Sequence, residues 1–334
     1  MKKTILVTGS AGFIGFHLCE SLLKENYIVI GVDSLTDYYD KNLKINRLKI
    51  LLKYENFNDI RLDITNFKGL SEIFDKYKPN KVIHLAAQAG VRYSIEHPRT
   101  YLEINILGSF NILELIKKHK IIHTLIASTS SVYGANTLMP FTENQKTETQ
   151  ISFYAATKKS CEILSHSYSH IHNLAITNFR FFTVYGPWGR PDMALFKFVK
   201  GIKENTPIDI YNNGEMKRDF TYISDLVEAI TLLIDCVPKK NNRISEKDSL
   251  SPVAPWRVIN IGNCKVEKLL DFIREIEINL GSKALKNYLP MQQGDVKETH
   301  ADNLLLYELT GFKPKIEIKE GIKNFCDWYN SYYC

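Results

Sequence analysis

The sequence predicts an α/β fold, a doubly wound parallel sheet with a smaller C-terminal lobe. Three observations predict it. The first half of the chain alternates short apolar segments with longer amphipathic ones, the pattern of repeated strand–helix units. A glycine-rich turn at residues 9–15 follows the first apolar segment. The 334 residues are 44% hydrophobic and 24% charged, which is typical of a folded enzyme and excludes disordered or collagen-like chains.

The elements of the first half follow in order from the apolar pattern. Residues 4–8 (TILVT) are mostly β-branched and uncharged, as in a strand buried on both faces. We expect further strands at 27–32, 58–62, 81–85 and 123–128, and helices at 12–25, 66–76 and 98–119. Because crossovers between parallel strands are almost always right-handed, this series predicts a Rossmann sheet covered by helices on both faces.

The second half is less regular and suggests the domain boundaries. We expect helices at 152–172 and 224–236 and strands at 174–180 and 257–261, the last of which rejoins the sheet. The polar segment 238–256, with three prolines, predicts a surface loop. The predicted division is a sheet domain over 1–180, rejoined by about 219–262, and a smaller lobe made of 181–218 and 263–334 over the carboxyl ends of the strands.

Net charge and cysteine usage exclude several classes of protein. The net charge of +6 is spread without a long basic block, which favours a solvated surface over nucleic-acid binding and leaves room for a local basic pocket for an anionic ligand. The six cysteines form no C-x-x-C pair. They predict buried or incidental thiols in a reducing compartment, and we therefore expect a cytoplasmic protein.

The N-terminus begins like a signal peptide but does not continue as one. A pair of lysines precedes the apolar residues 5–7, and this run already breaks at Thr8-Gly9-Ser10. A secretory signal needs about 7–15 apolar residues. Because no stretch of about 20 apolar residues exists either, we expect no membrane span.

The glycine-rich turn predicts a dinucleotide site. Gly9, Gly12 and Gly15 form a G-x-x-G-x-x-G pattern between a strand and a helix. Such glycines allow a sharp turn, close approach of the backbone to a pyrophosphate, and tight packing of the helix on the strand. The phosphates then lie at the helix N-terminus, where free N–H groups point at them.

An acidic residue at the end of the second strand predicts the type of dinucleotide. Asp33 lies 18 residues past Gly15. A carboxylate there accepts hydrogen bonds from the adenosine ribose and repels a 2′-phosphate. Since no Arg or Lys follows before Lys41, we expect NAD rather than NADP. A strand-end turn former is the alternative for Asp33, and Asp63-Ile64 is a weaker candidate for contact with the adenine.

A tyrosine and a lysine predict acid–base chemistry on the helix at 152–172. Tyr154 and Lys158 in YAATK lie one turn apart and so share one face. A lysine ammonium beside a phenol lowers the phenol pKa toward neutral pH. Tyr77 and Lys81 have the same spacing, but a proline intervenes and the segment runs into a strand, so this pair cannot present one helix face.

The hydroxyl run STSS at 128–131 gives Tyr154 a partner. It follows the fifth predicted strand, at whose carboxyl end ligands bind in this fold. A hydroxyl there holds the substrate oxygen that Tyr154 deprotonates. A plain turn is the alternative interpretation of the run.

Ordered motifs cover nearly the whole chain and identify a family. They are TGSAGFIG at 8–15, HLAAQAGVR at 84–92, STSSVYG at 128–134, YAATK at 154–158, RFFTVYGPWGRPDMALFKF at 180–198, RDFTY at 218–222, VINIGN at 258–263 and GDVKETHAD at 294–302. The chain resembles the extended short-chain dehydrogenases/reductases of the nucleotide-sugar epimerase branch. TVYGPWGRPDMA and GDVKETHAD make it most similar to the UDP-glucuronate 4-epimerases.

The resemblance implies roles for individual residues. Tyr154 would be the base, Lys158 would hold the nicotinamide ribose, and Thr129 would bond the 4-oxygen of the sugar. The residues that bind NAD would be Gly9, Gly12, Phe13, Ile14, Gly15, Asp33, Asp63, Ile64, Leu85, Ala86, Ala87, Ala89, Asn105, Tyr154, Lys158 and Phe182. The substrate residues would be Arg190 and Arg218 at the UDP phosphates, Tyr211 near the uracil, Asp295 near the ribose, Ser130, Ser131 and Thr183 around the position-6 group, and Arg92. Gln293 stands where UDP-glucose epimerases often have Arg, so that phosphate contact is not carried over.

The implied reaction is NAD-dependent 4-epimerisation of a UDP-sugar through a transient 4-keto intermediate, as a step in polysaccharide biosynthesis. UDP-glucuronate, converted to UDP-galacturonate, is the expected substrate, and UDP-glucose or UDP-N-acetylglucosamine is the alternative. A 4,6-dehydratase or decarboxylase usually has a carboxylate directly after the catalytic Ser/Thr, whereas here none follows Thr129 before Glu143. A non-catalytic NAD-binding scaffold is disfavoured because Thr129, Tyr154 and Lys158 are intact.

Two further features bear on metals and partners. His166 and His170 have helical i, i+4 spacing, but no H-E-x-x-H motif or cysteine cluster accompanies them, so we expect no metal. The helices at 98–119 and 152–172 carry apolar stripes, which ordinary packing on the sheet also explains. In the resembling family these helices pair across a dimer as a four-helix bundle, which implies a homodimer.

Overall fold

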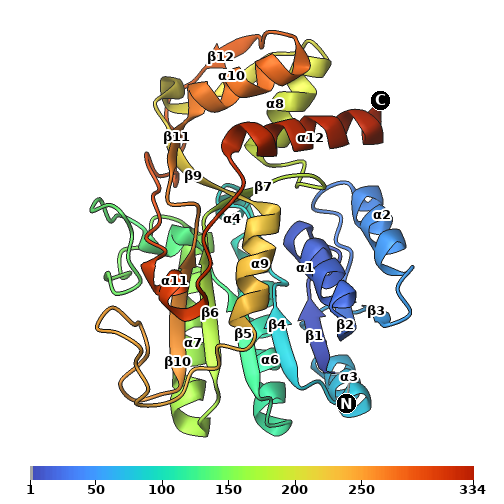
Figure 1. Ribbon diagram of the computed structural model, residues 1–334, viewed down its shortest axis with the longest axis vertical. Coiled ribbons are helices and arrows are strands. Elements are labelled where there is room, and N and C mark those ends of the chain that lie inside the picture. Colours follow the sequence, from blue (N-terminus) through green and yellow to red (C-terminus); the bar gives the residue numbers. More distant parts are fainter. Residues whose placement is uncertain (1–2) are drawn as a thin grey trace.

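A seven-stranded parallel sheet forms the centre of the computed structural model, which describes residues 3–334 (Figure 1). Its strands are β1 (Thr4–Thr8), β2 (Ile28–Asp33), β3 (Phe57–Arg61), β4 (Lys81–His84), β5 (His123–Ala127), β6 (Ile176–Phe181) and β10 (Trp256–Ile261). Their order across the sheet is β10-β6-β5-β4-β1-β2-β3. In this order β1 lies between β2 and β4, and the chain builds the sheet outward in one direction and then in the other from there, which confirms the predicted doubly wound sheet.

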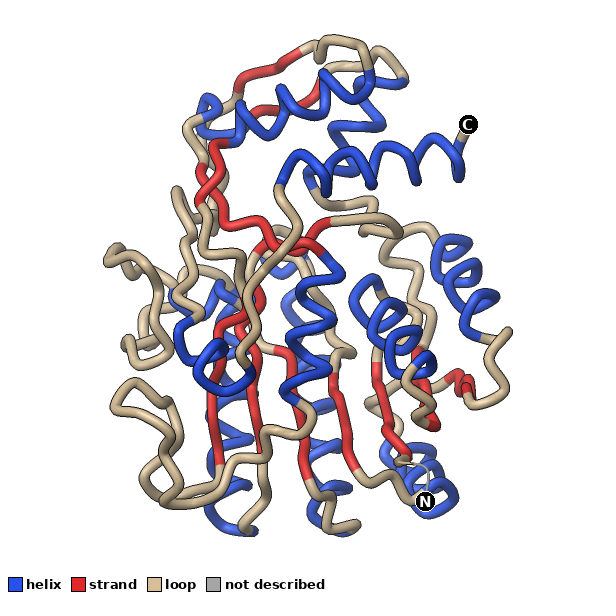
Figure 2. Tube along the Cα trace, viewed as in Figure 1, coloured by secondary structure: helices blue, strands red, loops and turns tan. Residues whose placement is uncertain are grey.

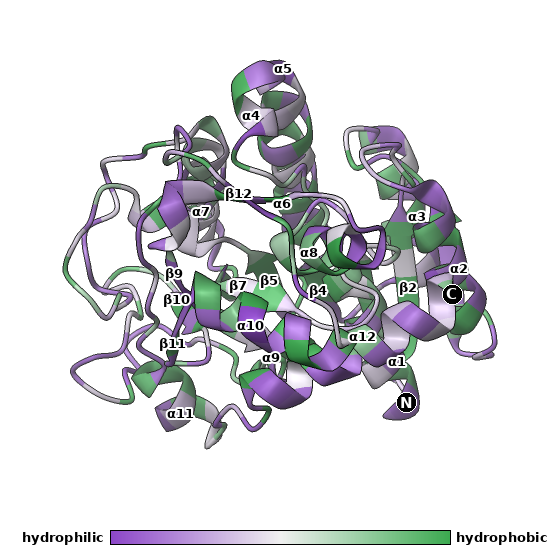
Figure 3. Ribbon diagram, turned by 90° about the horizontal axis from the view of Figure 1, so that it is seen from above, coloured by the Kyte–Doolittle hydropathy of each residue, from purple (hydrophilic) through white to green (hydrophobic). Residues whose placement is uncertain are grey.

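Two hydrophobic clusters bury the two faces of the sheet. On β1, Ile5 and Val7 belong to one cluster and Leu6 to the other, as alternation along a strand requires. One cluster includes apolar residues of α1 (Phe13–Lys24) and α9 (Ile223–Leu233). The other includes those of α3 (Phe67–Tyr77), α6 (Gly108–Lys118) and α7 (Phe153–His172). Figure 3 shows the resulting pattern, with hydrophobic residues on the central strands and hydrophilic ones on the outer loops.

Two segments differ from the sequence-based expectation. Between the second and third strands, where no element was expected, the structure has α2 (Lys41–Leu51). The buried residues of α2 include Lys44 and Arg47 beside three leucines, so cations interrupt its apolar stripe. The helix expected over 98–119 is three pieces, α5 (Pro98–Tyr101), the π-helical η1 (Leu102–Leu107) and α6. The short α4 (Tyr93–Glu96) precedes them.

The remaining elements form a lobe above the carboxyl ends of the central strands (Figure 1). They are β7 (Thr183–Tyr185), α8 (Ala194–Lys203), β8 (Ile208–Ile210), η3 (Tyr211–Gly214), β9 (Lys217–Tyr222), β11 (Val266–Lys268), α10 (Leu269–Leu280), β12 (Lys286–Tyr288) and α12 (Ile318–Tyr333). They include two small sheets, ordered β11-β9-β7 and β12-β8. By contrast, α11 (Leu304–Thr310) contacts α9 and β10 beside the large sheet. The domain boundaries given above stay a prediction.

The polar segment 238–256 contains no helix and only the first residue of β10, and Figure 2 shows it as a loop at the lower left. His166 and His170 on α7 contact this loop. The His166 ring nitrogen lies 2.8 Å from Ser251 Oγ, and that of His170 lies 3.0 Å from the Val253 carbonyl oxygen. Within residues 3–334, no helix is long and apolar enough to cross a membrane.

Candidate active site

A cleft of about 990 Å³ lies between the carboxyl ends of the central strands and the lobe. Segments that follow β1, β2, β4, β5 and β6 line one part of it, and residues of α8, β8, η3 and β9 line another. Ligands in doubly wound folds bind at this edge of the sheet, where the strand order reverses. The cleft contains all the predicted site residues except Asn105.

The phosphate loop connects β1 to α1 at one end of the cleft. Gly9 has a φ of +75°, which side chains disfavour, and its N–H donates to the Val32 carbonyl oxygen at 2.7 Å. A Cβ at Gly15 would collide with the Gly9 carbonyl oxygen, so α1 packs against the loop only with glycine there. Gly12 is the N-cap of α1 and has no capping side chain. The first N–H groups of α1 therefore lie at the cleft, ready for an anion.

Asp33 ends β2 and lines the cleft next to this loop. Its Oδ2 accepts a hydrogen bond from Ala11 N at 3.0 Å, and its Oδ1 accepts one from Leu35 N at 2.8 Å. The carboxylate thus orders the phosphate loop and its own turn, while one side stays open to the cleft. Both interpretations of Asp33, a ribose acceptor and a turn former, fit this geometry.

Helix α2 supplies cations that sequence reasoning missed. Lys44 lines the cleft, and its Nζ donates to Thr36 O at 2.7 Å. Burial, partly offset by Asp33, lowers the pKa of Lys44. Arg47 is fully buried and donates to Ala11 O at 2.9 Å and to Trp188 O at 2.5 Å. The sequence signal that could have revealed Lys44 and Arg47 is their i, i+3 spacing, which matches one face of a helix in a segment where no helix was expected.

The residues expected near the adenine and nicotinamide follow β3 and β4. Asp63 Oδ1 accepts from Thr65 N at 2.8 Å, which leaves the other carboxylate oxygen free of these turn contacts. After β4, Ala86 N donates to Thr8 Oγ1 at 3.1 Å, which fixes the backbone of the segment after β4 to the end of β1. The predicted residues that line this half of the cleft are Gly9, Gly12, Phe13, Ile14, Gly15, Asp33, Asp63, Ile64, Leu85, Ala86, Ala87, Ala89 and Phe182.

Asn105 is the predicted cofactor residue that does not line the cleft, and its contact with the cofactor stays a prediction. It lies in η1 and is fully buried. Its Oδ1 accepts from Gln88 N at 2.8 Å, and its Nδ2 donates to Gln88 O at 3.1 Å and to Thr157 Oγ1 at 3.1 Å. The amide therefore supports the loop after β4 from behind, because its donors and acceptor are already used by the protein.

The predicted catalytic residues meet at the centre of the cleft. Tyr154 and Lys158 lie on the first turns of α7, whose N-cap Ser152 accepts from Ala155 N at 3.1 Å. Thr129 lies two residues past the end of β5 and directly precedes the 3₁₀ turn η2 (Ser130–Tyr133). All three catalytic residues line the cleft.

The pKa of Tyr154 is raised in this structure, which differs from the expected lowering by Lys158. Burial of the phenol is the largest cause, and the hydroxyl of Thr129 and the guanidinium of Arg190 oppose it. Burial also lowers the pKa of Lys158. Both shifts arise because the pair lies away from water, where the charged form of each group loses its hydration.

Three hydroxyls line the wall beside Thr129. Ser130 and Ser131 belong to η2, and Thr183 begins β7. Thr129 Oγ1 donates to Ser131 Oγ at 3.2 Å, so the wall continues from the catalytic threonine. Glu143, the next carboxylate along the chain after Thr129, does not line the cleft. Its Oε1 instead accepts from Asn260 N at 2.8 Å.

Arg92 spans the cleft at its other end. It directly precedes α4 on the sheet side, and its guanidinium lies 4.6 Å from the centre of the Tyr211 ring in the lobe. The same guanidinium is 3.4 Å from the carboxylate of Asp295. Burial and Arg92 lower the pKa of the adjacent Arg218, and Asp295 raises it. Uracil stacking at Tyr211 stays a prediction.

Arg190 lies nearer the middle of the cleft. It forms a bidentate pair with Asp192, with contacts of 3.0 and 2.5 Å. Tyr38, which lines the cleft, donates to the same carboxylate at 3.3 Å. Asp192 and Tyr38 were not predicted. A phosphate contact by Arg190 stays a prediction, since its charge is here balanced by Asp192.

The residues present fit NAD. The phosphate loop presents backbone N–H groups without side chains, the carboxylate of Asp33 lines the cleft beside that loop, and Tyr154 and Lys158 line the same cleft. Among the residues that the structure describes, no three His, Cys, Asp or Glu side chains are grouped to hold a metal ion.

Comparison with known proteins assigns the chain. A family model described as GDP-mannose 4,6 dehydratase matches residues 6–325. Protein CapI of Staphylococcus aureus is 50% identical over 331 residues, which cover 98% of this chain and 99% of that protein. A probable UDP-glucuronate 4-epimerase of Rhizobium meliloti is 48% identical over 331 residues, 98% of this chain and 97% of that one.

Solved structures agree with the sequence matches. The crystal structure of UDP-glucuronic acid 4-epimerase from Bacillus cereus, in complex with UDP-glucuronic acid and NAD, superposes with a TM-score of 0.89 at 34% identity. The match covers 99% of this chain and 100% of that one. The likeness therefore includes the sheet, the lobe and the cleft between them.

Proposed function

The chain belongs to the GDP-mannose 4,6-dehydratase family, and we propose that within this family it is a UDP-glucuronate 4-epimerase. The reaction class is NAD-dependent 4-epimerisation of a UDP-sugar, which its relatives and solved neighbours share. The finer statement, that the sugar is glucuronate and the product UDP-galacturonate, is the proposal. In the cell this step would supply polysaccharide biosynthesis.

The residues at the cleft centre suit reversible oxidation at the 4-carbon. NAD, when bound, supplies the acceptor and then the donor of a hydride and ends unchanged. Tyr154 takes the proton of the 4-hydroxyl and later returns it to the 4-oxygen. Thr129 holds that oxygen, and Lys158 holds the nicotinamide ribose and its ammonium favours the phenolate. Inversion follows because the planar 4-keto sugar rotates before the proton and hydride return.

The wall of neutral hydroxyls carries the substrate proposal. Ser130, Ser131 and Thr183 line the cleft beside Thr129 and can bind a carboxylate with charge-assisted hydrogen bonds. When no substrate is present they leave no buried unpaired charge. A 4,6-dehydratase or decarboxylase would need a carboxylate at this wall, and Glu143 lies outside the cleft.

The cations of the cleft suit the other end of the substrate. Arg92, Arg190 and Arg218 all line it, and guanidinium groups bind phosphates in bidentate fashion. We assign Arg190 and Arg218 to the UDP phosphates, and Tyr211 and Asp295 to the uridine. Binding of the diphosphate would then replace Asp192 as the counter-ion of Arg190.

A homodimer is part of the proposal. Helices α5 to α7 expose large apolar side chains, among them Leu107 and Phe110 at 46% and 39% and Ile163 and Ile171 at 59% and 66%. Two copies could cover these side chains by forming a four-helix bundle. Phe110→Asp should then give a monomer in size-exclusion chromatography with light scattering.

The thiols suit the cytoplasm, where we place the protein. Cys19, Cys161 and Cys326 are free and buried. Burial raises the pKa of Cys19 and Cys326, which keeps these thiols protonated and inert in a reducing compartment.

The test is to incubate the purified protein with separate UDP-sugars and to resolve the products by chromatography. UDP-glucuronate should be converted fastest. Thr183→Val should slow the uronate more than UDP-glucose, because one charge-assisted hydrogen bond is worth about 1.5–3 kcal/mol, or roughly 10- to 150-fold. Faster conversion of UDP-glucose or UDP-N-acetylglucosamine by the wild type would refute UDP-glucuronate as the substrate but would not contradict 4-epimerisation as the reaction class.

A further inference from the structure

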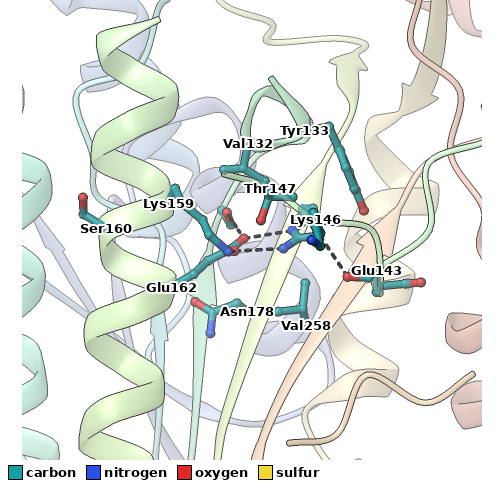
Figure 4. Close-up of polar contacts among 12 residues, drawn as sticks. Val132, Tyr133, Glu143, Lys146, Thr147, Lys159, Ser160, Glu162, Asn178 and Val258 are labelled. Atoms are coloured by element: carbon teal, nitrogen blue, oxygen red, sulfur yellow. Dashed lines mark hydrogen bonds and ion pairs between the residues drawn. The ribbon is translucent and has the colours of Figure 1, made fainter. Parts of the chain in front are cut away.

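A buried ion pair lies behind the cleft and outside its lining. Arg180 on β6 donates from Nε and Nη2 to the two carboxylate oxygens of Glu162 on α7, both at 2.9 Å. The two side chains are 3% and 1% exposed. Lys159, on the same helix, adds a contact of 3.2 Å to Glu162, and Figure 4 shows these dashed contacts converging on the carboxylate. Burial raises the pKa of Glu162, but the cations outweigh it and lower the pKa to about 2.

The carboxylate of Glu162 also joins two walls of the catalytic centre. Ser128 Oγ donates to Glu162 Oε1 at 2.7 Å, and Ser128 is the residue before Thr129. Glu162 follows Lys158 by four residues and so lies one turn further on the same face of α7. One anion therefore ties the segment after β5 to α7 one turn beyond the catalytic lysine.

Arg180 extends the tie to the hydroxyl wall. Its guanidinium carbon lies 4.8 Å from the centre of the Tyr133 ring in η2, and its Nη1 donates to the Glu143 carbonyl oxygen at 3.3 Å. The Tyr133 hydroxyl donates to Asn260 Oδ1 at 2.6 Å. Figure 4 shows Tyr133 and Glu143 on the far side of this network from Glu162. The hydroxyls of Ser130 and Ser131 thus lie on η2, the turn that Arg180 supports through Tyr133.

Stability alone does not account for such a pair. Two charges taken out of water regain in mutual attraction about what they lose in hydration, so apolar residues would stabilise the fold as well. What an ion pair with fixed bidentate geometry adds is orientation. The orientation set here is that of Ser128, the residue before Thr129, which lines the cleft together with Tyr154.

We propose that Glu162 and Arg180 are positioning residues that, through Ser128, hold the Thr129 hydroxyl against the Tyr154 phenol. The inference rests on the proposed function, because Thr129 and Tyr154 take their roles from it. The Thr129 hydroxyl opposes the rise that burial causes in the pKa of Tyr154. If Ser128 no longer anchors the segment, Thr129 loses its fixed place and the phenol becomes harder to ionise.

The test uses Ser128, because removing Glu162 or Arg180 leaves a buried unpaired charge that endangers folding. Ser128→Ala removes one donor and keeps the ion pair, and Ser128→Thr keeps the hydroxyl. Ser165→Ala is the matched control, since Ser165 is a buried serine of α7 outside the cleft lining, whose hydroxyl accepts from Asn178 and Trp256 and donates to the backbone oxygen of Glu162 without touching its carboxylate. The kcat and KM for UDP-glucuronate are measured across pH, with melting temperatures alongside.

The expected result for Ser128→Ala is a kcat reduced by roughly 10-fold with KM unchanged, within the loss that a misplacement of about 1 Å causes. Its kcat–pH profile should have the acidic limb shifted to higher pH, and Ser128→Thr should restore both kcat and the limb. Ser165→Ala should change only the melting temperature. An unshifted limb in Ser128→Ala, or the same shift in Ser165→Ala, overturns the inference. Failure of the proposed function would instead appear as a wild type that converts no UDP-sugar.

Discussion

Replacing Tyr154 by phenylalanine separates chemistry from structure at the cleft centre. The ring of Tyr154 packs edge-on against Tyr101, with 6.1 Å between centroids, and phenylalanine keeps this contact. What is lost is one hydroxyl, which interacts with Thr129. Loss of one such neutral hydrogen bond costs about 0.5–1.5 kcal/mol of folding stability. At roughly 2–4 °C per kcal/mol for a chain of this class, the melting temperature should fall by only a few degrees.

The effect on turnover should be much larger. Acid–base groups contribute at least about 100-fold, so kcat should fall by that factor, equivalent to about 2.7 kcal/mol of transition-state stabilisation. NAD content and binding of the UDP-sugar should be largely kept, because neither depends on the proton of the phenol. Turnover is measured by chromatography of the UDP-sugars, and NAD by absorbance after denaturation.

Tyr77→Phe is the matched control for this experiment. Tyr77 has the same spacing to a lysine, but it ends α3 and does not line the cleft. Its variant should turn over like the wild type. Turnover near the wild-type rate in Tyr154→Phe would refute the assignment of the base.

Three further outcomes are expected. Gly15→Ala should lower the melting temperature and abolish NAD retention. Gly12→Ala, whose new Cβ meets only Gly9 O at 3.0 Å, should keep the melting temperature and weaken NAD binding. Equal melting temperatures for the two variants would contradict this expectation. Asp33→Ala should weaken NAD and relax the bias against NADP, as measured by binding titrations with both dinucleotides. Burial lowers the pKa of His123 to about 4 in the folded protein. As pH drops from about 6.5 to 4, the unfolded chain therefore binds a proton at this histidine before the folded protein does, and the free energy of unfolding falls by about 3 kcal/mol for this group. His123→Gln should flatten that fall in chemical denaturation series, and an unchanged slope would argue against a buried neutral ring.

The strands and the catalytic residues were predictable because their signals are local. β1 and β2 are short runs of mostly apolar and buried residues, and the glycines and YAATK depend on spacings of a few residues. Helix α2 was missed because Lys44 and Arg47 take inward positions, and a buried cation looks like a surface residue in a hydrophobicity pattern. The partners that make those cations acceptable, such as Trp188 O, lie far away in the chain.

Asn105 and Tyr154 show a second limit. The resemblance implies that Asn105 lies near the cofactor. In the structure it lies in the π-helical segment η1, and its amide is hydrogen-bonded to the backbone of Gln88, which the motif alone does not indicate. For Tyr154, the spacing to Lys158 indicates a neighbouring charge but not how deeply both groups are buried. Burial depends on the lobe that covers them, which the local motif does not contain.

The walls at the two ends of the cleft are held by arginines of unequal burial, and we expect this difference to give the two ligands different residence times. Arg47 is fully buried and joins the phosphate loop to the segment after β7 through carbonyl oxygens, and each hydrogen bond of this kind to a charged group is worth about 1.5–3 kcal/mol. Arg92 is 47% exposed, and an exposed pair of this kind is worth about 0–1 kcal/mol. We therefore expect the substrate end to open more readily than the dinucleotide end. A sugar nucleotide would then enter, invert and leave while one dinucleotide stays in place, a closed redox cycle that draws nothing from the cellular NAD pool.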